Sequence, residues 1–595
     1  MKPVLFLHIF ILFSLNALTQ TGKQQDYLGD IRQEMQKKWP HNKTINLVFH
    51  GHSVPSGYFN TPYVRTMLAY PQQVLEAVKE IYPYAVVNSI TTAIGGENAE
   101  QGAKRFEQDV LCHNPDVLFI DYALNDRGIG LKRSRQAWGE MIKEAQRQGI
   151  KVILMTPTPD LTENMLDDNS PLEQYSKQIR DLSVKYGTGL VDSYAAFKQK
   201  KKDGRDLNAF MSQSNHPNEK GHEVVKELIL DYFFDKNQWK EYNRNSTLKT
   251  IRKVADWQLM HFESQVQKGS RWPNSHAYWA WTNATLYIGM AECAGLTGEQ
   301  RYWDFLLTVA KKNGWKTGPN PYFADDLCIV QPYAMLYNQF REPYMIGESV
   351  GILDSIISQP RKVSLRYDAE GSHSRWCWAD ALFMAPTSFA RIGKITGEKV
   401  YYDFMDQEFR VTYDTLYSRT DSLFYRDTRY KQMKEENGGK VFWGRGNGWV
   451  AGGLAIIIDH LPENYPSRNF YTTLFKEMMG KIARLQDESG FWHPSLLDPE
   501  AYSMPESSAS AFFTYTLFWG INRGYLNREK YLPIALKAWN AIHSVVHVDG
   551  KIGFVQAIGA DPKKVDFNDT EVYGTGAFLL AAVEYCLMKP KDRSK

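Results

Sequence analysis

The chain has 595 residues, of which 43% are hydrophobic and 23% are charged, so it can hold two or three domains with cores of their own. This composition excludes a disordered, collagen-like or coiled-coil protein. With 70 lysines and arginines against 67 aspartates and glutamates, the net charge is +3, and no basic face indicates a nucleic-acid partner. Of the 16 tryptophans, 13 follow residue 240, which suggests two halves with different roles.

The N-terminus has the pattern of an export signal. Lys2 precedes an apolar run over residues 4–15, which is shorter than the roughly 20 residues that a membrane-spanning helix needs. Small and polar residues follow at Asn16, Ala17 and Thr19. We therefore predict a cleaved signal peptide over residues 1–20, no membrane span, and a secreted protein of the bacterial periplasm.

The cysteines and histidines show no spacing typical of a metal site. The five cysteines are odd in number and widely separated, and we expect mostly free, buried thiols. His216 and His222 lie six residues apart, a poor spacing for two ligands on one helix. We predict neither a metal nor an organic cofactor.

Residues 44–235 alternate between apolar runs and amphipathic stretches. The runs that we predict as strands are 45–50, 85–90, 116–121, 151–157 and 189–193. The stretches that we predict as helices between them include 71–81, 134–148 and 172–186. This alternation predicts an α/β domain with a doubly wound, mostly parallel sheet. Ligands of such sheets bind beyond the carboxyl ends of the strands.

After residues 235–247, which suggest a linker or a first helix, long helical patterns dominate. They cover 248–267, 282–296, 300–313, 378–396, 399–417, 448–460, 469–486, 507–523, 531–545 and 575–587. Paired helices in such number, joined by loops rich in Gly, Pro, Trp and Tyr, predict an all-α domain over residues 245–590. We expect the pairs to stack in a ring whose connecting loops surround one mouth.

Small and polar residues follow successive strands of the α/β half. Ser53 stands after the first strand, the Gly95–Gly96 pair after the second, Asn125 after the third, and His216 far downstream. A serine just past a strand can expose its hydroxyl as a nucleophile. These four blocks, in this order, resemble the SGNH (GDSL-like) hydrolases over residues 44–235.

The resemblance implies a serine esterase. In that family the serine attacks an ester carbonyl and the histidine takes its proton, which gives these roles to Ser53 and His216. The amide of the serine, a glycine amide and an asparagine side chain bind the oxyanion, here with Gly96 and Asn125.

Two positions depart from the family pattern. The aspartate that usually follows the first glycine is His52, and the aspartate that usually orients the catalytic histidine is Gln213. A neutral glutamine stabilises an imidazolium less than a carboxylate does. Three possibilities stay open: a Ser53–His216 dyad, substitution by an acid such as Asp206, or a weak or inactive esterase.

Three segments of the helical half combine acids, aromatics and glycines. Asp325 and Asp326 open one helix, Asp380 lies in an apolar and aromatic helix start, and residues 442–449 read Phe-Trp-Gly-Arg-Gly-Asn-Gly-Trp. An acid in apolar surroundings has a raised pKa and can donate a proton near neutrality. An arginine suits a substrate carboxylate, and tryptophan faces suit sugar rings.

Together these segments resemble glycoside hydrolase families 88 and 105, the unsaturated uronyl hydrolases that include unsaturated rhamnogalacturonyl hydrolases. Residues 490–493, 506–510 and 573–577 support the resemblance, which spans about 248–588. It implies an (α/α)6 barrel. It also implies that an aspartate protonates C4 of a 4,5-unsaturated uronate, that water adds at C5, and that the product collapses to release the aglycone.

By the same resemblance, Asp380 is the general acid and base, with Asp325 or Asp326 as its partner, and Arg445 holds the uronate carboxylate. Family members often carry a histidine where this chain has Arg426, which can change the sugar that is accepted. The other residues that we expect at the substrate are Trp376, Trp378, Trp443, Asn447, Trp449, Trp492 and His493.

We therefore predict a bifunctional enzyme that degrades polysaccharides of the pectin or rhamnogalacturonan type. Its partner is an oligosaccharide, made by a lyase, with an unsaturated uronate end; the esterase half would remove acyl groups. Two alternatives are a glycan-binding protein with a catalytically weak or inactive α/β half, and an esterase whose helical half only positions the substrate.

Overall fold

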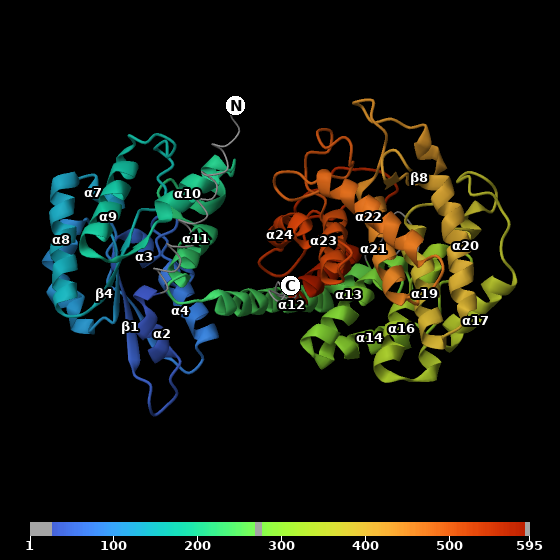
Figure 1. Cartoon of the computed structure of the whole chain (residues 1–595), viewed down its shortest axis with the longest axis horizontal. Helices are drawn as coiled ribbons and strands as arrows, with labels where there is room; N and C mark the ends of the chain where they lie inside the picture. Colours follow the sequence, from blue (N-terminus) through green and yellow to red (C-terminus); the bar gives the residue numbers. More distant parts are fainter. Residues whose placement is uncertain (1–25, 268–275, 589–595) are drawn as a thin grey trace, which may run out of the picture. The chain divides into compact units, whose positions relative to one another are not determined.

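The computed structural model describes residues 26–267 and 276–588 (Figure 1). The predicted signal peptide lies outside these ranges. The chain divides into two compact units, Met1–Arg244 and Asn245–Lys595. In the described ranges, no helix is both long enough and apolar enough to cross a membrane.

The first unit contains a five-stranded parallel sheet with the order β2-β1-β3-β4-β5. The strands, all at the predicted places, are β1 (Thr44–Gly51), β2 (Val86–Thr91), β3 (Val117–Asp121), β4 (Lys151–Met155) and β5 (Gly189–Val191). Val117 and Phe119 of β3 belong to one buried cluster, whereas Leu118 and Ile120 belong to another. Because alternate residues of a strand point to opposite faces, both faces of the sheet are buried, as the doubly wound prediction requires.

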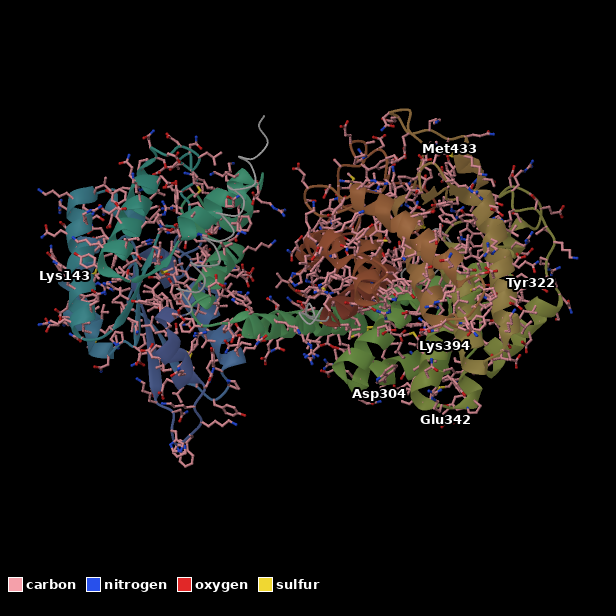
Figure 2. All side chains as sticks on the ribbon, viewed as in Figure 1. Lys143, Asp304, Tyr322, Glu342, Lys394 and Met433 are labelled. Atoms are coloured by element: carbon pink, nitrogen blue, oxygen red, sulfur yellow. The ribbon has the colours of Figure 1, made fainter. Side chains whose placement is uncertain are left out.

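Helices cover both faces of this sheet. The longer ones are α2 (Gly29–Met35), α4 (Tyr70–Ile81), α8 (Leu131–Arg147), α9 (Pro171–Tyr186), α10 (Ser193–Lys202) and α11 (Glu219–Leu230). Helices α4 and α11 pack together, as do α8 and α9. Their outer faces are polar: Lys143 on α8 projects into solvent, like Asp304 and Lys394 in the second unit (Figure 2).

The second unit is a closed ring of helix pairs. The inner helices, each packed on the next and the last on the first, are α13 (Trp281–Thr297), α16 (Val330–Phe340), α19 (Pro386–Thr396), α21 (Gly444–His460), α23 (Ser507–Asn522) and α25 (Val572–Cys586). The outer helices are α12 (Lys236–Gln267), α14 (Gln300–Lys312), α17 (Gly347–Ser358), α20 (Lys399–Leu416), α22 (Arg468–Arg484) and α24 (Arg528–Ser544). Between residues 236 and 588, apart from the undescribed segment 268–275, six outer and six inner helices alternate, which confirms the (α/α)6 prediction.

Three details differ from the predicted helices. Helices α16 and α17 were not predicted. Helix α16 carries Pro332 near its start, which indicates a break, and α17 contains Gly351, which disfavours a helix. The predicted helix over 378–396 is two helices, α18 (Ala381–Met384) and α19, because Pro386 begins a new helix. Helix α12 begins at Lys236, earlier than the helix predicted over 248–267, so of the two possibilities for residues 235–247 the first helix is confirmed and the linker is wrong.

The ring closes where α13 meets α25 through two glycines. A Cβ atom on Gly289 would lie 2.4 Å from the carbonyl oxygen of Gly576. A Cβ atom on Gly576 would lie 2.3 Å from the carbonyl oxygen of Thr285. Real Cβ atoms do not approach backbone oxygens so closely, so only glycine permits this helix contact.

We predict that Gly289→Ala lowers the free energy of unfolding of the helical unit by about 1–3 kcal/mol, because the added methyl must push two backbones apart. Gly295→Ala is the matched control on the same helix. A Cβ atom at Gly295 would meet nothing within 4 Å, so this variant should be unchanged or more stable by up to about 1 kcal/mol. Denaturant unfolding followed by tryptophan fluorescence compares the two. Equal stability of both variants would show that the close approach of α13 and α25 is not a constraint.

Candidate active sites

Ser53 and His216 meet beyond the carboxyl end of β1. Ser53 is the first residue of the short helix α3 (Ser53–Ser56), and His216 begins strand β7 (His216–Pro217). The distance from Ser53 Oγ to His216 Nε2 is 2.8 Å, and both side chains are buried. The structure thus brings the predicted nucleophile and base within hydrogen-bonding distance.

A backbone carbonyl orients His216. Its Nδ1 lies 3.0 Å from the carbonyl oxygen of Phe59, to which it can only donate. Nε2 is then the unprotonated nitrogen that accepts the hydroxyl proton of Ser53, which is the tautomer that a general base needs. The Phe59 carbonyl therefore occupies the place of the orienting carboxylate.

The suggestion that Asp206 replaces the missing acid is wrong. Its carboxylate caps the 3-10 helix η3 (Leu207–Phe210), where it accepts a hydrogen bond of 3.0 Å from the amide of Asn208. Gln213 does not contact His216 through its side chain either. Instead, its Oε1 accepts a hydrogen bond of 3.0 Å from the amide of Thr61. Gln213 thereby holds the loop that presents the Phe59 carbonyl.

Burial lowers the pKa of His216, and nearby His52 lowers it further, whereas the Phe59 carbonyl opposes this change only in part. The imidazole is therefore neutral at neutral pH. A neutral imidazole bonded to a hydroxyl is competent to act as a base without a carboxylate behind it.

The predicted oxyanion donors lie after β2 and β3. Gly96 has a φ of +80° in a turn that is closed by a bond from the Glu97 amide to the Ile94 carbonyl. Asn125 lies in the short helix α7 (Ala123–Asp126), and its Nδ2 donates to the Glu97 carbonyl at 2.9 Å. One hydrogen of that amide group remains for a ligand. A serine nucleophile with amide donors on adjacent strand ends is suited to acyl transfer.

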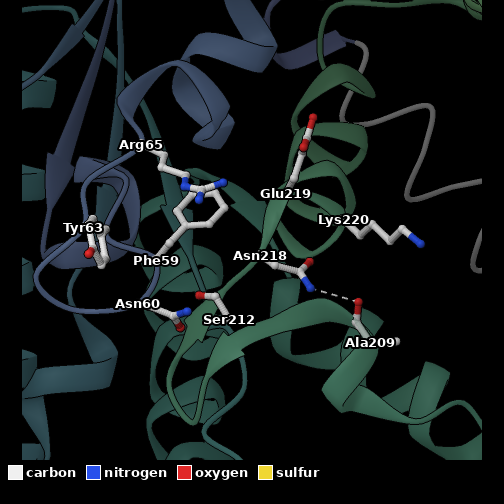
Figure 3. A pocket seen from close by; sticks show the side chains of 9 residues that line it. All are labelled: Phe59, Asn60, Tyr63, Arg65, Ala209, Ser212, Asn218, Glu219 and Lys220. Carbon is white, nitrogen blue, oxygen red and sulfur yellow. Dashed lines mark hydrogen bonds between the residues drawn. The ribbon is translucent and has the colours of Figure 1, made fainter. Parts of the chain in front are cut away.

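A groove of about 540 Å³ adjoins the loop that supports His216 (Figure 3). Phe59, whose carbonyl contacts the histidine, forms part of its wall. Arg65 and Lys220 supply cations, and Ser212 and Asn60 supply neutral polar groups. Ser53 does not line this groove, so it is a feature of the supporting loop and not the site of the nucleophile.

A cavity of about 670 Å³ opens in the helical unit where several inner helices begin. Asp325 and Asp326 enter it from α15 (Ala324–Leu327), which precedes α16, and Asp380 enters it from the residue before α18. Trp378 and Trp443 also line it. With Arg426, which also lines it, six of the predicted residues share one cavity.

The three acids differ in their surroundings. Burial raises the pKa of Asp380. Burial and the charge of Asp380 raise the pKa of Asp325 to about 8, and burial raises that of Asp326 to about 6. Asp326 is fixed by a bond of 2.7 Å from the Asn320 amide, whereas Asp325 is coupled electrostatically to Asp380. Two such close carboxyl groups retain a proton near neutrality.

Arg426 faces these acids. Its Nε lies 3.8 Å from Asp380 Oδ2. Asp427, a fully buried acid that the sequence analysis missed, accepts bonds of 2.7 Å from Arg426 and 2.8 Å from Arg429. Burial opposes ionisation of Asp427, but the two arginines outweigh it and hold its pKa below the ordinary value. Both guanidinium groups also lie over the ring of Tyr367, which fixes them in the cavity wall.

Arg445 requires a correction, because it does not line the cavity. Its guanidinium is almost fully buried behind Trp443, over whose ring it lies. It donates to the carbonyl oxygens of Gln556 and Ala557 and contacts the hydroxyl of Tyr573. These bonds occupy the two terminal nitrogens of the Arg445 guanidinium, which were expected to hold a uronate carboxylate. The arginines that line the cavity are Arg426 and Arg429.

Five other predicted substrate residues also lie outside the lining of this cavity. Asn447 bonds to both backbone groups of Phe424, and Trp449 packs against Phe383 and Phe512. The rest are Trp376, which packs against Phe389; Trp492, which donates to Ile482; and His493, which pairs with Asp487.

Gln556 is a second residue that the sequence analysis missed. This buried side chain accepts a bond of 3.2 Å from Trp443 Nε1 and donates one of 2.8 Å to the carbonyl of Asp561. Its backbone amide donates to Glu506 at 3.1 Å. Residues 558–561 form part of the cavity wall, so Gln556 joins that wall to Trp443. No local pattern around Gln556 indicates these distant contacts.

Two family models match the chain. Glycosyl Hydrolase Family 88 matches residues 250–589, and the GDSL-like Lipase/Acylhydrolase family matches residues 49–224. The folds and sites define a glycan-degrading hydrolase that carries a GDSL-like unit in front of a helical barrel. The chain belongs to glycosyl hydrolase family 88. Both resemblances drawn from the sequence are confirmed.

Individual relatives agree with this assignment. An unsaturated 3S-rhamnoglycuronyl hydrolase of Alteromonas sp. (strain LOR) is 38% identical over 57% of this chain and 86% of its own length. A protein of the same name from Formosa agariphila is 37% identical over 54% of this chain and 89% of its own. A solved structure of a glycosyl hydrolase family 88 protein from Bacteroides vulgatus has a TM-score of 0.52 and 33% identity, covering 58% of this chain and 99% of that one.

Proposed function

We propose that the helical unit removes a 4,5-unsaturated uronate from the non-reducing end of oligosaccharides that polysaccharide lyases produce. The observation that carries this proposal is the buried acid Asp380, coupled to Asp325 and facing Arg426 in a cavity lined by tryptophans. Relatives named unsaturated 3S-rhamnoglycuronyl hydrolases support an unsaturated glycuronyl group joined to rhamnose as the substrate.

The raised pKa of Asp380 suits it to deliver a proton. The carboxyl proton passes to C4 of the enol ether, and positive charge develops at C5 and the ring oxygen. Water attacks C5 and gives up a proton to the Asp380 carboxylate, and C5 becomes a hemiketal carbon. Opening of the hemiketal and loss of the C1 substituent release the aglycone as an alcohol.

Asp325 favours the protonated form of Asp380, and Arg426 favours its ionised form. Before proton transfer, like-charge repulsion from Asp325 favours the protonated form of the pair. After the transfer, Arg426 stabilises the Asp380 carboxylate. We therefore assign Asp325 as the partner, because the carboxylate of Asp326 is fixed by the Asn320 amide.

Arg426 and Arg429 are the groups that we propose to bind the uronate carboxylate. Asp427 neutralises one of their two charges, so the pair keeps one positive charge towards the cavity. A carboxylate placed on a guanidinium fork gains charge-assisted hydrogen bonds.

The proposal predicts that the protein abolishes the ultraviolet absorbance of the conjugated double bond in lyase-treated polysaccharides. Asp380→Asn should reduce this rate at least about 10³-fold, because asparagine cannot donate the proton, whereas exposed Asp304→Asn should retain it. Absorbance that persists in pectic, ulvan and glycosaminoglycan products would contradict the proposal. It would then favour the reading in which this unit only positions or binds a glycan.

The pH dependence of kcat/KM tests the role of Arg426. The reaction needs protonated Asp380, so the rate falls as pH rises through the raised pKa of that group. Arg426 lowers the pKa of both Asp325 and Asp380, so Arg426→Gln should move the basic limb of the profile to higher pH. Arg426→Lys, which keeps the charge, should move it less. A shift to lower pH in Arg426→Gln would refute the assignment.

We further propose that the first unit hydrolyses esters on a glycan. Ser53 Oγ attacks the acyl carbonyl while His216 Nε2 takes its proton, and the Phe59 carbonyl bonds to Nδ1–H of the resulting imidazolium. The imidazolium then protonates the departing sugar alcohol, and water releases the acyl group from Ser53 by the same steps. The contact of 2.8 Å between the two side chains carries this second proposal.

We expect Ser53→Ala to abolish hydrolysis of p-nitrophenyl acetate and labelling by a fluorophosphonate probe, while the uronate reaction continues. Asp380→Asn should have the reverse effect, and exposed Ser214→Ala should change neither activity. Because the pKa of His216 is lowered, the acid limb of the esterase profile should lie below the ordinary histidine value. Wild-type protein that neither hydrolyses the ester nor takes the label would leave the first unit as a glycan-binding module.

A further inference from the structure

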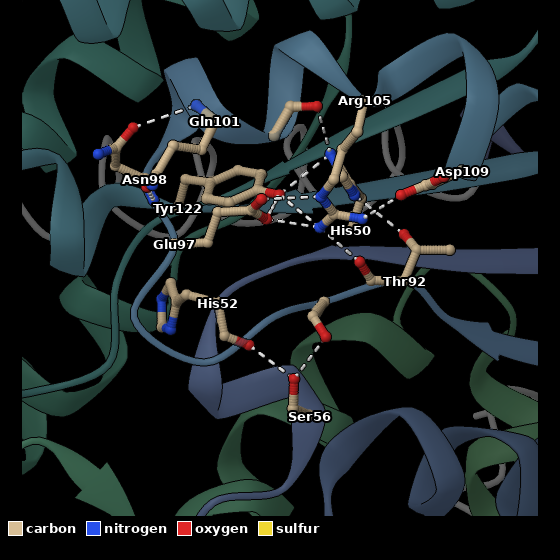
Figure 4. Close-up of polar contacts among 12 residues, drawn as sticks. His50, His52, Ser56, Thr92, Glu97, Asn98, Gln101, Arg105, Asp109 and Tyr122 are labelled. Atoms are coloured by element: carbon tan, nitrogen blue, oxygen red, sulfur yellow. Dashed lines mark hydrogen bonds and ion pairs between the residues drawn. The ribbon is translucent and has the colours of Figure 1, made fainter.

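A buried polar network lies directly behind the proposed oxyanion site (Figure 4). At its centre is Glu97, which follows Gly96 in the chain and is buried. Its carboxylate accepts a bond of 2.8 Å from Arg105 Nε and another of 2.8 Å from the Tyr122 hydroxyl. Charge-assisted bonds of this kind fix a side chain much more firmly than neutral ones.

Each hydrogen bond in this network can be assigned one donor and one acceptor without conflict. Burial and nearby Arg105 lower the pKa of His50 to about 3, so its ring is neutral. His50 Nε2 lies 3.0 Å from the Tyr122 hydroxyl, and Nδ1 lies 2.9 Å from Thr92 Oγ1. Because the Tyr122 hydroxyl donates to Glu97, it accepts from Nε2–H, and Nδ1 accepts from Thr92. Every bond is satisfied, so the network holds one arrangement.

Glu97 joins the two segments that carry the oxyanion donors. Its backbone carbonyl accepts the bond of 2.9 Å from Asn125 Nδ2, and its side chain binds Tyr122, three residues earlier in the same segment. Glu97 is therefore attached to that segment at two points, one through its backbone and one through its side chain. Gly96 precedes it at a φ of +80°, so a rotation of Glu97 would move both donors.

The surroundings of Tyr122 leave it little freedom. A Cβ atom on Gly102 would lie 2.3 Å from the Tyr122 oxygen, so the hydroxyl fills the space that the glycine leaves. Arg105 also donates to the Thr92 carbonyl at 2.6 Å, just beyond the end of β2. The network thus ties the ends of β2 and β3 to the turn at Gly96.

We propose that Glu97 is the positioning residue of the oxyanion site, holding the Gly96 amide and the Asn125 side chain in one fixed relation. The inference rests on the ester hydrolysis proposed for Ser53. Glu97 does not touch the substrate; it acts by preorganising donors whose value depends on small displacements.

Glu97→Gln and Tyr122→Phe in the full chain test this role with p-nitrophenyl acetate. Each should lower kcat about tenfold or more with little change in KM, because the donors bind the developing oxyanion and not the ground state. Glu100→Gln is the matched control: Glu100 lies three residues further on and pairs with Arg133 at the surface. It should retain full activity. Unchanged kcat in both network variants would overturn the proposal.

A double-mutant cycle separates positioning from a general loss of structure. Asn125→Ala alone should lower kcat/KM about 10²-fold. If Glu97 acts through Asn125, the combined Glu97→Gln and Asn125→Ala variant should lose less than the product of the single losses. Losses that multiply would show that Glu97 acts independently, and would refute the inference.

Two measurements distinguish this failure from failure of the esterase proposal. Wild-type protein that neither hydrolyses the ester nor reacts with the fluorophosphonate removes the proposed function, and the inference with it. Wild-type activity together with unaffected network variants removes only the inference. The rate of the uronate reaction, measured on every variant, reports whether the second unit of the same molecule is intact.

Discussion

The helical unit depends on the close approach of α13 and α25, which two facing glycines make possible. This contact completes the ring and sets Trp281 of α13 against Tyr573 of α25, with ring centroids 5.2 Å apart. The Tyr573 hydroxyl then meets Arg445, which holds the backbone of Gln556. Gln556 in turn binds Trp443 in the cavity wall. The cavity is thus supported from the helix contact outward, through Tyr573, Arg445 and Gln556, which do not line it.

The two units differ in how completely the buried polar groups near their sites are hydrogen-bonded. In the first unit, each side chain of the Glu97 network behind the proposed oxyanion site has a partner, so the network has one conformation. In the second unit, Asp380 is buried with Arg426 Nε 3.8 Å away, too far for a good hydrogen bond. Such a carboxyl group favours its neutral form because burial penalises its charge. A network in which every hydrogen bond is made is rigid. A buried carboxyl group without a full set of partners instead retains a proton that it can donate.

Local patterns in the sequence predicted most elements and indicated candidate residues for both sites. Strand alternation located β1 to β5, and four small or polar residues after strands located Ser53, Gly96, Asn125 and His216. Contacts between distant segments could not be predicted in this way. The Phe59 carbonyl that orients His216 has no sequence signature, because every residue has a carbonyl. Arg445 was predicted to bind the substrate because nothing in its local motif indicates a partner for its guanidinium. In the structure that guanidinium donates to the carbonyl of Gln556, more than a hundred residues away. Helix α16 was not predicted because Pro332 stands near its start, and a proline inside a helical pattern indicates a break.

The Phe59 carbonyl has a consequence for the chain as a whole. A carbonyl carries no net negative charge, so it stabilises an imidazolium less than an aspartate would, and burial lowers the pKa of His216. Burial raises the pKa of Asp380, in the other unit, so this carboxyl group keeps its proton to higher pH than an exposed aspartate does. One group is a base that resists protonation, and the other is an acid that resists ionisation. The lowered pKa of the base and the raised pKa of the acid both widen the pH range in which the two groups hold their reactive forms together, so one environment can serve both halves of the molecule.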